Sequence, residues 1–291
     1  MNGTTALDGV LHRAYAVRAG PVHGSEADGE IRVDFADPAE WAAFRAAVAV
    51  ESLPGFDCMC GGDVRFEMLD RRGERLAVVF LHHGETLRWE QWDGDAVLRD
   101  GRLLLDWLAG HGMTGPLREF EADRQRAAER SEEERGWLAA MPAGLEESAD
   151  RILALSRTGG RPSPELLSEL TDRLRSAFPD PVQRVLALLD WYGSGSGRCS
   201  GYPVHEGVPG ELLGSVAIAD LLAALADPRA GERHDSGAVR HLVGWKTRPD
   251  QKRDVAGLPE PLRARLLALA RRSGDTDKRG RAERWLAPSR A

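Results

Sequence analysis

The chain has 291 residues, of which 42% are hydrophobic and 29% are charged, which excludes disorder over most of its length and allows one large or two average domains. No apolar stretch approaches the roughly 20 residues that cross a bilayer, and residues 1–17 lack a basic start followed by an apolar segment. We therefore expect a cytoplasmic protein with no membrane partner. Three cysteines without a secretory signal argue against a disulfide framework.

The net charge of −7 is unevenly divided along the chain. Residues 1–150 carry 16 basic and 29 acidic side chains, whereas residues 151–291 carry 23 basic and 17 acidic ones. We expect the basic C-terminal region to face the acidic half of the same chain, with an acidic partner protein or nucleic acid as alternatives. Nucleic acid is not the favoured partner, because no recognised nucleic-acid motif accompanies the charge.

The first elements along the chain are two short strands and a helix. Residues 15–19 and 31–35 read as strands. Asp37 and Pro38 then open a helix as its N-cap and first helical residue, and Leu53-Pro54-Gly55 ends this helix. The apolar residues of this helix recur at helical spacing and predict a core-facing side, made of Trp41, Phe44, Ala47 and Val48.

Residues 64–92 predict a three-strand antiparallel meander. The runs 64–70, 75–82 and 86–92 are separated by turn residues, and the middle run is apolar on both faces, so it should be central. A turn near residue 72 makes paired residue numbers sum to roughly 144, which sets Gly61 or Gly62 opposite His82 or His83. This register gathers two cysteines and two histidines at one end of the sheet.

The four gathered residues, Cys58, Cys60, His82 and His83, are the candidate site. Thiolate and imidazole are the usual ligands of zinc and also suit other transition metals, while a thiol beside an imidazole can become a nucleophile or redox centre. The Cys-x-Cys step is shorter than the usual knuckle, and adjacent histidines on a strand point to opposite faces, so both join only if the turn reorients one. The alternative is a pair of structural cysteines near a turn histidine.

A charged segment divides the chain. Residues 101–108 predict a helix, and residues 117–137 alternate charges with almost no apolar stripe, which suits a solvated connecting helix or linker. We therefore predict an α+β domain over residues 1–115, the connecting segment over 116–144 and an α-helical domain over 145–291.

The helical part contains three predicted helix pairs. Their ranges are 164–177 with 181–192, 211–226 with 236–246, and 260–272 with 277–287. Each second helix ends in tryptophan, namely Trp191, Trp245 or Trp285, which predicts that these side chains are buried. The last two tryptophans are 40 residues apart, so the region resembles a short HEAT-type helical repeat. An irregular helical bundle is the alternative.

The longest irregular stretch of this part, residues 193–210, is rich in glycine and serine. Its amides and Arg198 could cradle an anion or contact a partner, and its other side chains are nucleophile and base types. The candidate residues of this loop are Ser194, Ser196, Arg198, Ser200, His205 and Glu206. Neither a P-loop nor a G-x-S-x-G elbow is present, so hydrolytic chemistry is disfavoured.

No catalytic set is complete, and whether the protein is an enzyme stays open. We predict a non-catalytic protein-interaction or regulatory protein whose partner is another protein, because repeat-like helices build binding surfaces. The alternative is a metal-dependent or thiol enzyme that uses the Cys58, Cys60, His82 and His83 cluster with zinc or another transition metal. The second alternative is nucleic-acid binding through the C-terminal helices.

Overall fold

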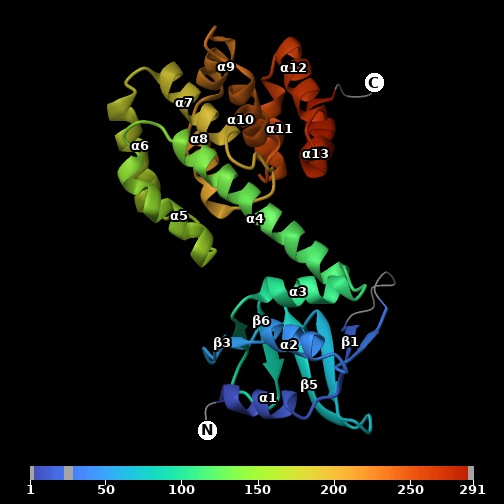
Figure 1. The fold of residues 1–291 in the computed structure, drawn as a ribbon. Helices are drawn as coiled ribbons and strands as arrows, with labels where there is room; N and C mark the ends of the chain where they lie inside the picture. The colour runs from blue at the N-terminus through green and yellow to red at the C-terminus, as the bar shows by residue number, and fades with distance from the viewer. Residues whose placement is uncertain (1–2, 23–28, 288–291) are drawn as a thin grey trace. The chain divides into compact units, whose positions relative to one another are not determined.

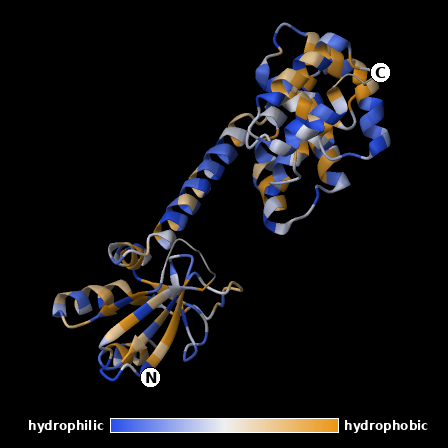
Figure 2. Cartoon of the chain, turned by 90° about the vertical axis from the view of Figure 1, so that its right-hand side faces the viewer, coloured by the Kyte–Doolittle hydropathy of each residue, from blue (hydrophilic) through white to orange (hydrophobic). Residues whose placement is uncertain are grey.

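The computed structural model describes residues 3–22 and 29–287, and the chain divides into two compact units, Met1–Ala127 and Ala128–Ala291 (Figure 1). The first contains an antiparallel sheet with helices and the second is helical, as predicted. The boundary falls inside α4 (Gly115–Ala139), a 25-residue helix within the segment that we expected to be charged and connecting. Figure 2 shows that α4 is hydrophilic over most of its length.

Within the described residues, the first unit contains a seven-stranded antiparallel sheet of order β2-β1-β4-β5-β6-β7-β3. The strands are β1 (Ala16–Pro21), β2 (Ile31–Asp34), β3 (Val50–Ser52), β4 (Val64–Leu69), β5 (Arg75–His82), β6 (Thr86–Trp89) and β7 (Ala96–Leu98). The predicted meander is present as β4-β5-β6 with β5 in the middle of the sheet. Its third strand ends three residues earlier than expected, at Trp89, and β3 and β7 were not predicted. The helix expected to run as far as Leu53-Pro54-Gly55 ends at Ala47, because the chain enters β3 at Val50.

The register of β4 and β5 positions the ends of these strands. Val64 pairs with Leu81, which is one residue away from the expected register because a bulge lies between Met68 and Leu69. The Asp63 N–H donates to the Leu81 carbonyl at 2.7 Å and extends the pairing toward the Cys-x-Cys loop. The end of β5 and the start of β4 therefore meet, as the sequence indicates.

Three helices accompany the sheet, α1 (Gly3–Leu11), α2 (Pro38–Ala47) and α3 (Gly101–Gly110). The Asp37 carboxylate caps α2 by accepting from the Ala39 N–H at 2.9 Å. Phe44 on α2 packs against Phe66 of β4 and Trp107 of α3, with ring centroids 6.2 and 4.8 Å apart. The core of the first unit thus lies between the sheet and these helices (Figure 1).

The second unit is a bundle of short helices. Its elements are η1 (Glu146–Ser148), α5 (Ala149–Thr158), α6 (Pro164–Ala177), α7 (Pro181–Gly193), η2 (Val204–Gly207), α8 (Val208–Leu213), α9 (Ile218–Ala226), α10 (Glu232–Val243), α11 (Arg248–Ala256), α12 (Glu260–Arg271) and α13 (Thr276–Leu286). The segment 211–226, which we predicted as one helix, is broken into α8 and α9, and α5 and α11 were not predicted. Among the described residues no single helix is long and apolar enough to span a membrane; only Val204–Leu213 and Ile218–Ala226 taken together reach that length and composition, with a 103° bend between them.

The HEAT-type repeat is not confirmed. Trp191 is fully buried and Trp285 partly buried, but Trp245 is 72% exposed and lies beyond the end of α10, so our prediction for Trp245 is wrong. Helix α10 packs against both α7 and α12, as the central helix of a bundle does. At Gly237 of α10 a Cβ would come within 2.1 Å of the Leu189 carbonyl of α7, so the close crossing of these helices requires glycine.

Candidate metal centre

The two cysteines and two histidines of the candidate site converge. Cys58 and Cys60 lie in the loop before β4, His82 ends β5, and His83 begins the turn to β6. The two Sγ atoms are 3.0 Å apart, and His83 Nε2 is 3.3 Å from each of them. His82 Nδ1 is 3.0 Å from Cys60 Sγ. Cys58, Cys60 and His82 therefore form one group of ligand-type atoms, and His83 Nε2 contacts both of its sulfurs.

The turn after β5 explains how adjacent histidines reach the same place. His82 keeps extended strand geometry, whereas His83 has φ of 53°, a left-handed conformation that few residues other than glycine adopt. The Asp63 carboxylate accepts a hydrogen bond from the His83 N–H and holds this conformation. The strand alternation that would place the two rings on opposite faces ends at His82. The turn then directs the His83 ring to the same sulfur, Cys60 Sγ, that the His82 ring contacts.

Arg88 and Asp95 hold the loop that carries the cysteines. Arg88 Nε and Nη2 donate to the two Asp95 carboxylate oxygens at 2.7 and 2.9 Å. The Asp95 carboxylate also accepts from the Cys58 N–H at 2.8 Å, while Arg88 donates to the Cys58 and Cys60 carbonyls. Both carbonyls and one amide of the Cys-x-Cys segment are thereby fixed by side chains from β6 and the start of β7.

The electrostatics of the cluster favour the metal-binding protonation states at Cys58 and His82 and oppose them at Cys60 and His83. Hydrogen bonds with Cys60 and then His83 lower the pKa of Cys58, whereas burial and the contact with Cys58 raise the pKa of Cys60. Burial, followed by the positive charge of Arg88, lowers the pKa of His82 and keeps its ring neutral. The hydrogen bond with Cys58 raises the pKa of His83. A thiolate and a neutral imidazole are the forms that coordinate a cation.

The donor set fits a tetrahedral ion. Ligands at about 2.3 Å for sulfur and about 2.0–2.1 Å for nitrogen sit roughly 3.3–3.8 Å from one another around zinc. The observed separations of 3.0–3.3 Å are only slightly shorter, so small side-chain rotations reach coordination distances. A ring that coordinates through Nδ1 carries its proton on Nε2, and the Nε2 atom of His82 is buried without a partner among the described residues. The usual outer hydrogen bond of a metal-bound histidine is thus missing at His82.

The glycine-serine loop of the second unit holds a carboxylate of this chain itself. The Ser196 N–H and hydroxyl donate to the Glu206 carboxylate at 2.9 and 2.7 Å, and Arg240 pairs with it at 2.8 Å. At Gly195 a Cβ would lie 2.6 Å from this carboxylate, so only glycine fits there. One of the amides that we predicted to cradle an external anion, that of Ser196, is therefore directed at Glu206.

The other candidate residues of that loop make local contacts. His205 Nδ1 lies 2.8 Å from the Ser156 hydroxyl on α5. The Ser194 hydroxyl donates to the Trp191 carbonyl at 2.6 Å, and the Ser200 hydroxyl to the Tyr202 carbonyl at 3.4 Å. Arg198 is exposed. Apart from the contact between the Ser196 hydroxyl and the Glu206 carboxylate, these contacts do not join the nucleophile and base types of the loop to one another.

The supporting residues Arg88 and Asp95 were missed in the sequence, although a signal for Arg88 exists. Register pairs Phe80 with Arg88 and His82 with Thr86, so Arg88 lies on the same sheet face as His82. Alternation with the apolar Leu87 and Trp89 alone would assign Arg88 to solvent. Asp95 follows a turn and carries no comparable signal.

Comparison of the chain with family models, with curated proteins and with solved structures found no match. The functional assignment therefore follows from the chemistry of the residues.

Proposed function

We propose that the protein is a zinc-binding interaction or regulatory protein in which Cys58, Cys60, His82 and His83 hold one zinc ion. The observation that supports this proposal is the convergence of two Sγ and two imidazole nitrogen atoms within 3.0–3.3 Å contacts. Two sulfur and two nitrogen donors in a tetrahedron are a preferred set for zinc.

A structural or regulatory role follows from the number of ligands. Catalytic zinc sites keep a coordination position open for water or substrate, whereas structural sites are closed by four protein ligands. Four protein ligands here leave no such position. The ion would tie the loop before β4 to the turn after β5, two segments that are joined through the Asp63 N–H to Leu81 carbonyl hydrogen bond.

The loop between β3 and β4 also carries the surface that we assign to a partner protein. Phe56 is 69% exposed and Met59, between the two cysteines, is fully exposed. Large apolar side chains exposed on a folded protein are typical of interaction sites. Because Cys58 and Cys60 flank Met59, metal binding would fix the position of the side chain that contacts the partner.

Elemental analysis of the purified chain tests the metal. We expect about one zinc per chain in the wild type and none in a Cys58→Ser, Cys60→Ser double variant, because two thiolates are lost. Cys199→Ala is the matched control, since Cys199 is the third free cysteine and lies in the second unit. Full zinc content in the double variant, or equal loss in the control, contradicts the proposal.

A dithiol centre is the second candidate function. It is favoured by the 3.0 Å separation of two free thiols, of which Cys58 has a lowered pKa. In this case the wild type contains no stoichiometric metal, and Cys58 reacts rapidly with a thiol reagent at neutral pH. Mass spectrometry of the labelled chain distinguishes this outcome from zinc binding, because a bound ion protects both thiols.

No specific observation favours nucleic-acid binding by the C-terminal helices. Arg265, Arg271 and Arg272 pair with acidic side chains of the same unit at 2.8–3.1 Å. Much of the basic character of this region is thereby offset by its own carboxylates.

A further inference from the structure

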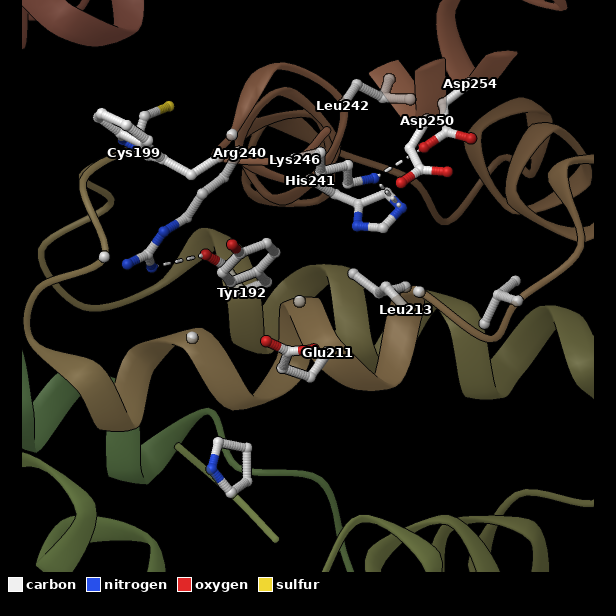
Figure 3. Close-up of a pocket in the computed structure, with 18 of the residues that line it drawn as sticks. Tyr192, Cys199, Glu211, Leu213, Arg240, His241, Leu242, Lys246, Asp250 and Asp254 are labelled. Carbon is white, nitrogen blue, oxygen red and sulfur yellow. Dashed lines mark hydrogen bonds and ion pairs between the residues drawn. The ribbon is translucent and has the colours of Figure 1, made fainter. Parts of the chain in front are cut away.

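The second unit contains a cavity of about 940 Å³ (Figure 3). Its lining includes Arg240, the ion-pair partner of Glu206. Its walls come from α7, α8, α10 and α11 and from the beginning of α9. The volume lies in the range of small-molecule sites, about 300–1,000 Å³. Figure 3 shows Tyr192 and Leu213 on one side of the cavity and His241 and Lys246 facing them.

The exposed apolar side chains of the second unit gather at this cavity. Within its described residues the large hydrophobic side chains that stand exposed are Tyr202 at 71%, Ile218 at 39% and Trp245 at 72%. All three line the cavity. The Arg281 guanidinium lies 4.3 Å from the Trp245 ring centroid and orients this exposed indole. An apolar surface restricted to a hollow is typical of a ligand site.

The cavity wall contains a hydrogen-bond donor that the protein leaves unpaired. The Lys246 ammonium donates to His241 Nε2 at 3.1 Å and to the Asp254 carboxylate at 2.9 Å. An ammonium cannot accept, so Nε2 is the acceptor and the ring proton sits on Nδ1. Nδ1 is sealed from solvent and has no partner in the described part of the chain, so a ligand reaches it only after the wall around His241 moves. The Tyr192 hydroxyl, on the facing wall, is a second polar group available to an occupant.

The charges of the wall compensate one another. Arg240 pairs with the Glu206 carboxylate at 2.8 Å, and Lys246 pairs with Asp254. Arg253 pairs with Asp250 and Asp254 at 2.9 and 3.2 Å. Arg161 and Glu211 also line the cavity and carry opposite charges, so the wall together with Glu206 has four positive and four negative groups. An ionic ligand therefore meets no net charge that would replace its lost hydration.

We propose that this cavity binds a small uncharged molecule with a planar aromatic or heteroaromatic ring. The ring stacks on Trp245 or Tyr202 at the mouth, and an acceptor atom of the ligand receives a hydrogen bond from the wall. Stacking on aromatic side chains recognises the ring plane, and the compensated wall selects against charge.

Probes of matched shape test the ligand class on the full-length protein. Adenosine and riboflavin are planar and uncharged, adenosine monophosphate adds charge to the same ring, and cyclohexanol has no aromatic plane. We expect saturable shifts of the Trp245 indole N–H resonance with at least one of the two uncharged planar probes. Adenosine monophosphate should bind several-fold more weakly than adenosine, and cyclohexanol should leave the resonance unchanged. No saturable shift with either planar probe, or equal shifts with cyclohexanol, overturns the proposal.

Exposed aromatic residues provide matched variants. Trp245→Ala and Tyr202→Ala should each weaken binding of the planar probe by about tenfold, as measured by calorimetry, because one stacking surface is lost. Both side chains are largely exposed, so folding should be unaffected. Phe56→Ala is the control, since Phe56 is similarly exposed but lies in the first unit. Unchanged affinity in both cavity variants, or an equal loss in the control, refutes stacking at this site.

Discussion

Two polar clusters, one in each unit, differ in whether the chain itself supplies the counter-charge for their polar groups. In the second unit Glu206 is surrounded by Arg240 and Ser196, and its side chain is 1% exposed. In the first unit the ligand-type atoms of Cys58, Cys60 and His82 form one group without a cation from the protein, and His83 contacts both sulfurs. One cluster supplies its own counter-charge, and the other offers ligands for a charge from outside.

This difference separates structural from functional polar groups better than residue type does. The sequence contains serine, histidine and acid side chains in the glycine-serine loop, which are catalytic types, yet Glu206 serves to anchor the loop on Arg240. A buried ion pair is costly to break and offers no free lone pair to a ligand. The cysteine-histidine cluster keeps its donor atoms directed at one point, and this geometry is what a metal needs.

The largest effect should come from removing one member of the completed cluster. Arg240→Met leaves the Glu206 carboxylate buried without its cation, and we expect a loss of about 3–5 kcal/mol in the free energy of unfolding. Chemical denaturation followed by the fluorescence of Trp137 and Trp191 reports this unit.

The double variant Arg240→Met, Glu206→Gln is the control for that experiment. It removes both charges, so it should be less destabilised than Arg240→Met alone. If Arg240→Met unfolds at the wild-type denaturant concentration, the pair does not stabilise the second unit and the contrast between the clusters is lost.

Zinc should stabilise the first unit and leave the second unchanged. At a free zinc concentration 100 times the dissociation constant, binding to the folded state contributes about 2.7 kcal/mol. Hydrogen exchange should therefore slow in β4 and β5 on adding zinc, but not in α7 and α10. Equal slowing in both units, or none in either, contradicts a site confined to the cysteine-histidine cluster.

Loss of the Arg88 side chain, which holds the Cys-x-Cys loop, should reduce zinc affinity less than loss of the cysteine ligands. Arg88→Lys cannot keep both hydrogen bonds to Asp95 and reach the cysteine carbonyls, so zinc affinity should fall about 10- to 100-fold. Competition with a zinc-binding dye measures this change. Arg102→Lys is the control, because Arg102 forms an exposed ion pair with Asp106. An unchanged affinity in Arg88→Lys shows that the loop is held without this side chain.

Much of the fold could be predicted from the sequence, because the local signals of caps, turns and periodicity agree with the packing. The cap at Asp37, the meander and helices α6, α7, α12 and α13 all follow from caps, turns and periodicity. The break between α8 and α9 was missed because apolar residues continue through 211–226 and mask it. The position of Trp245 at the end of a predicted helix suggested that it is buried, although α10 ends before it.

The proximity of the cysteines and histidines was predictable from register, but their mutual orientation was not. Strand pairing places the Cys-x-Cys loop beside the end of β5. Whether both rings turn to the sulfurs depends on the left-handed conformation of His83, which no pattern in the neighbouring residues specifies. The role of Glu206 was missed because its partner Arg240 is 34 residues away on another helix.

His241 has a partner within the chain for only one of its two ring nitrogens, so it is intermediate between the two clusters. Lys246 donates to Nε2, and no described residue accepts from Nδ1. Burial, and then the charge of Lys246, lower the pKa of His241 to about 3, while Asp254 opposes the shift. The unfolded chain, with a histidine pKa near 6.5, binds more protons than the folded one between these values. The contribution of His241 to stability is therefore complete above about pH 6.5 and is lost as the pH falls toward 3.

The expected slope from this single residue is at most about 1.4 kcal/mol per pH unit between pH 4 and 6. Denaturation of the second unit at several pH values measures it, and His241→Leu should reduce the slope by that amount. Burial also lowers the pKa of His205, so part of the acid sensitivity should remain in the variant. An imidazole of His241 that titrates near pH 6 in the folded wild type, as followed by NMR, would show that Nδ1 reaches water. In that case His241 belongs with the open cluster, and its donor is accessible to solvent and to ligands alike.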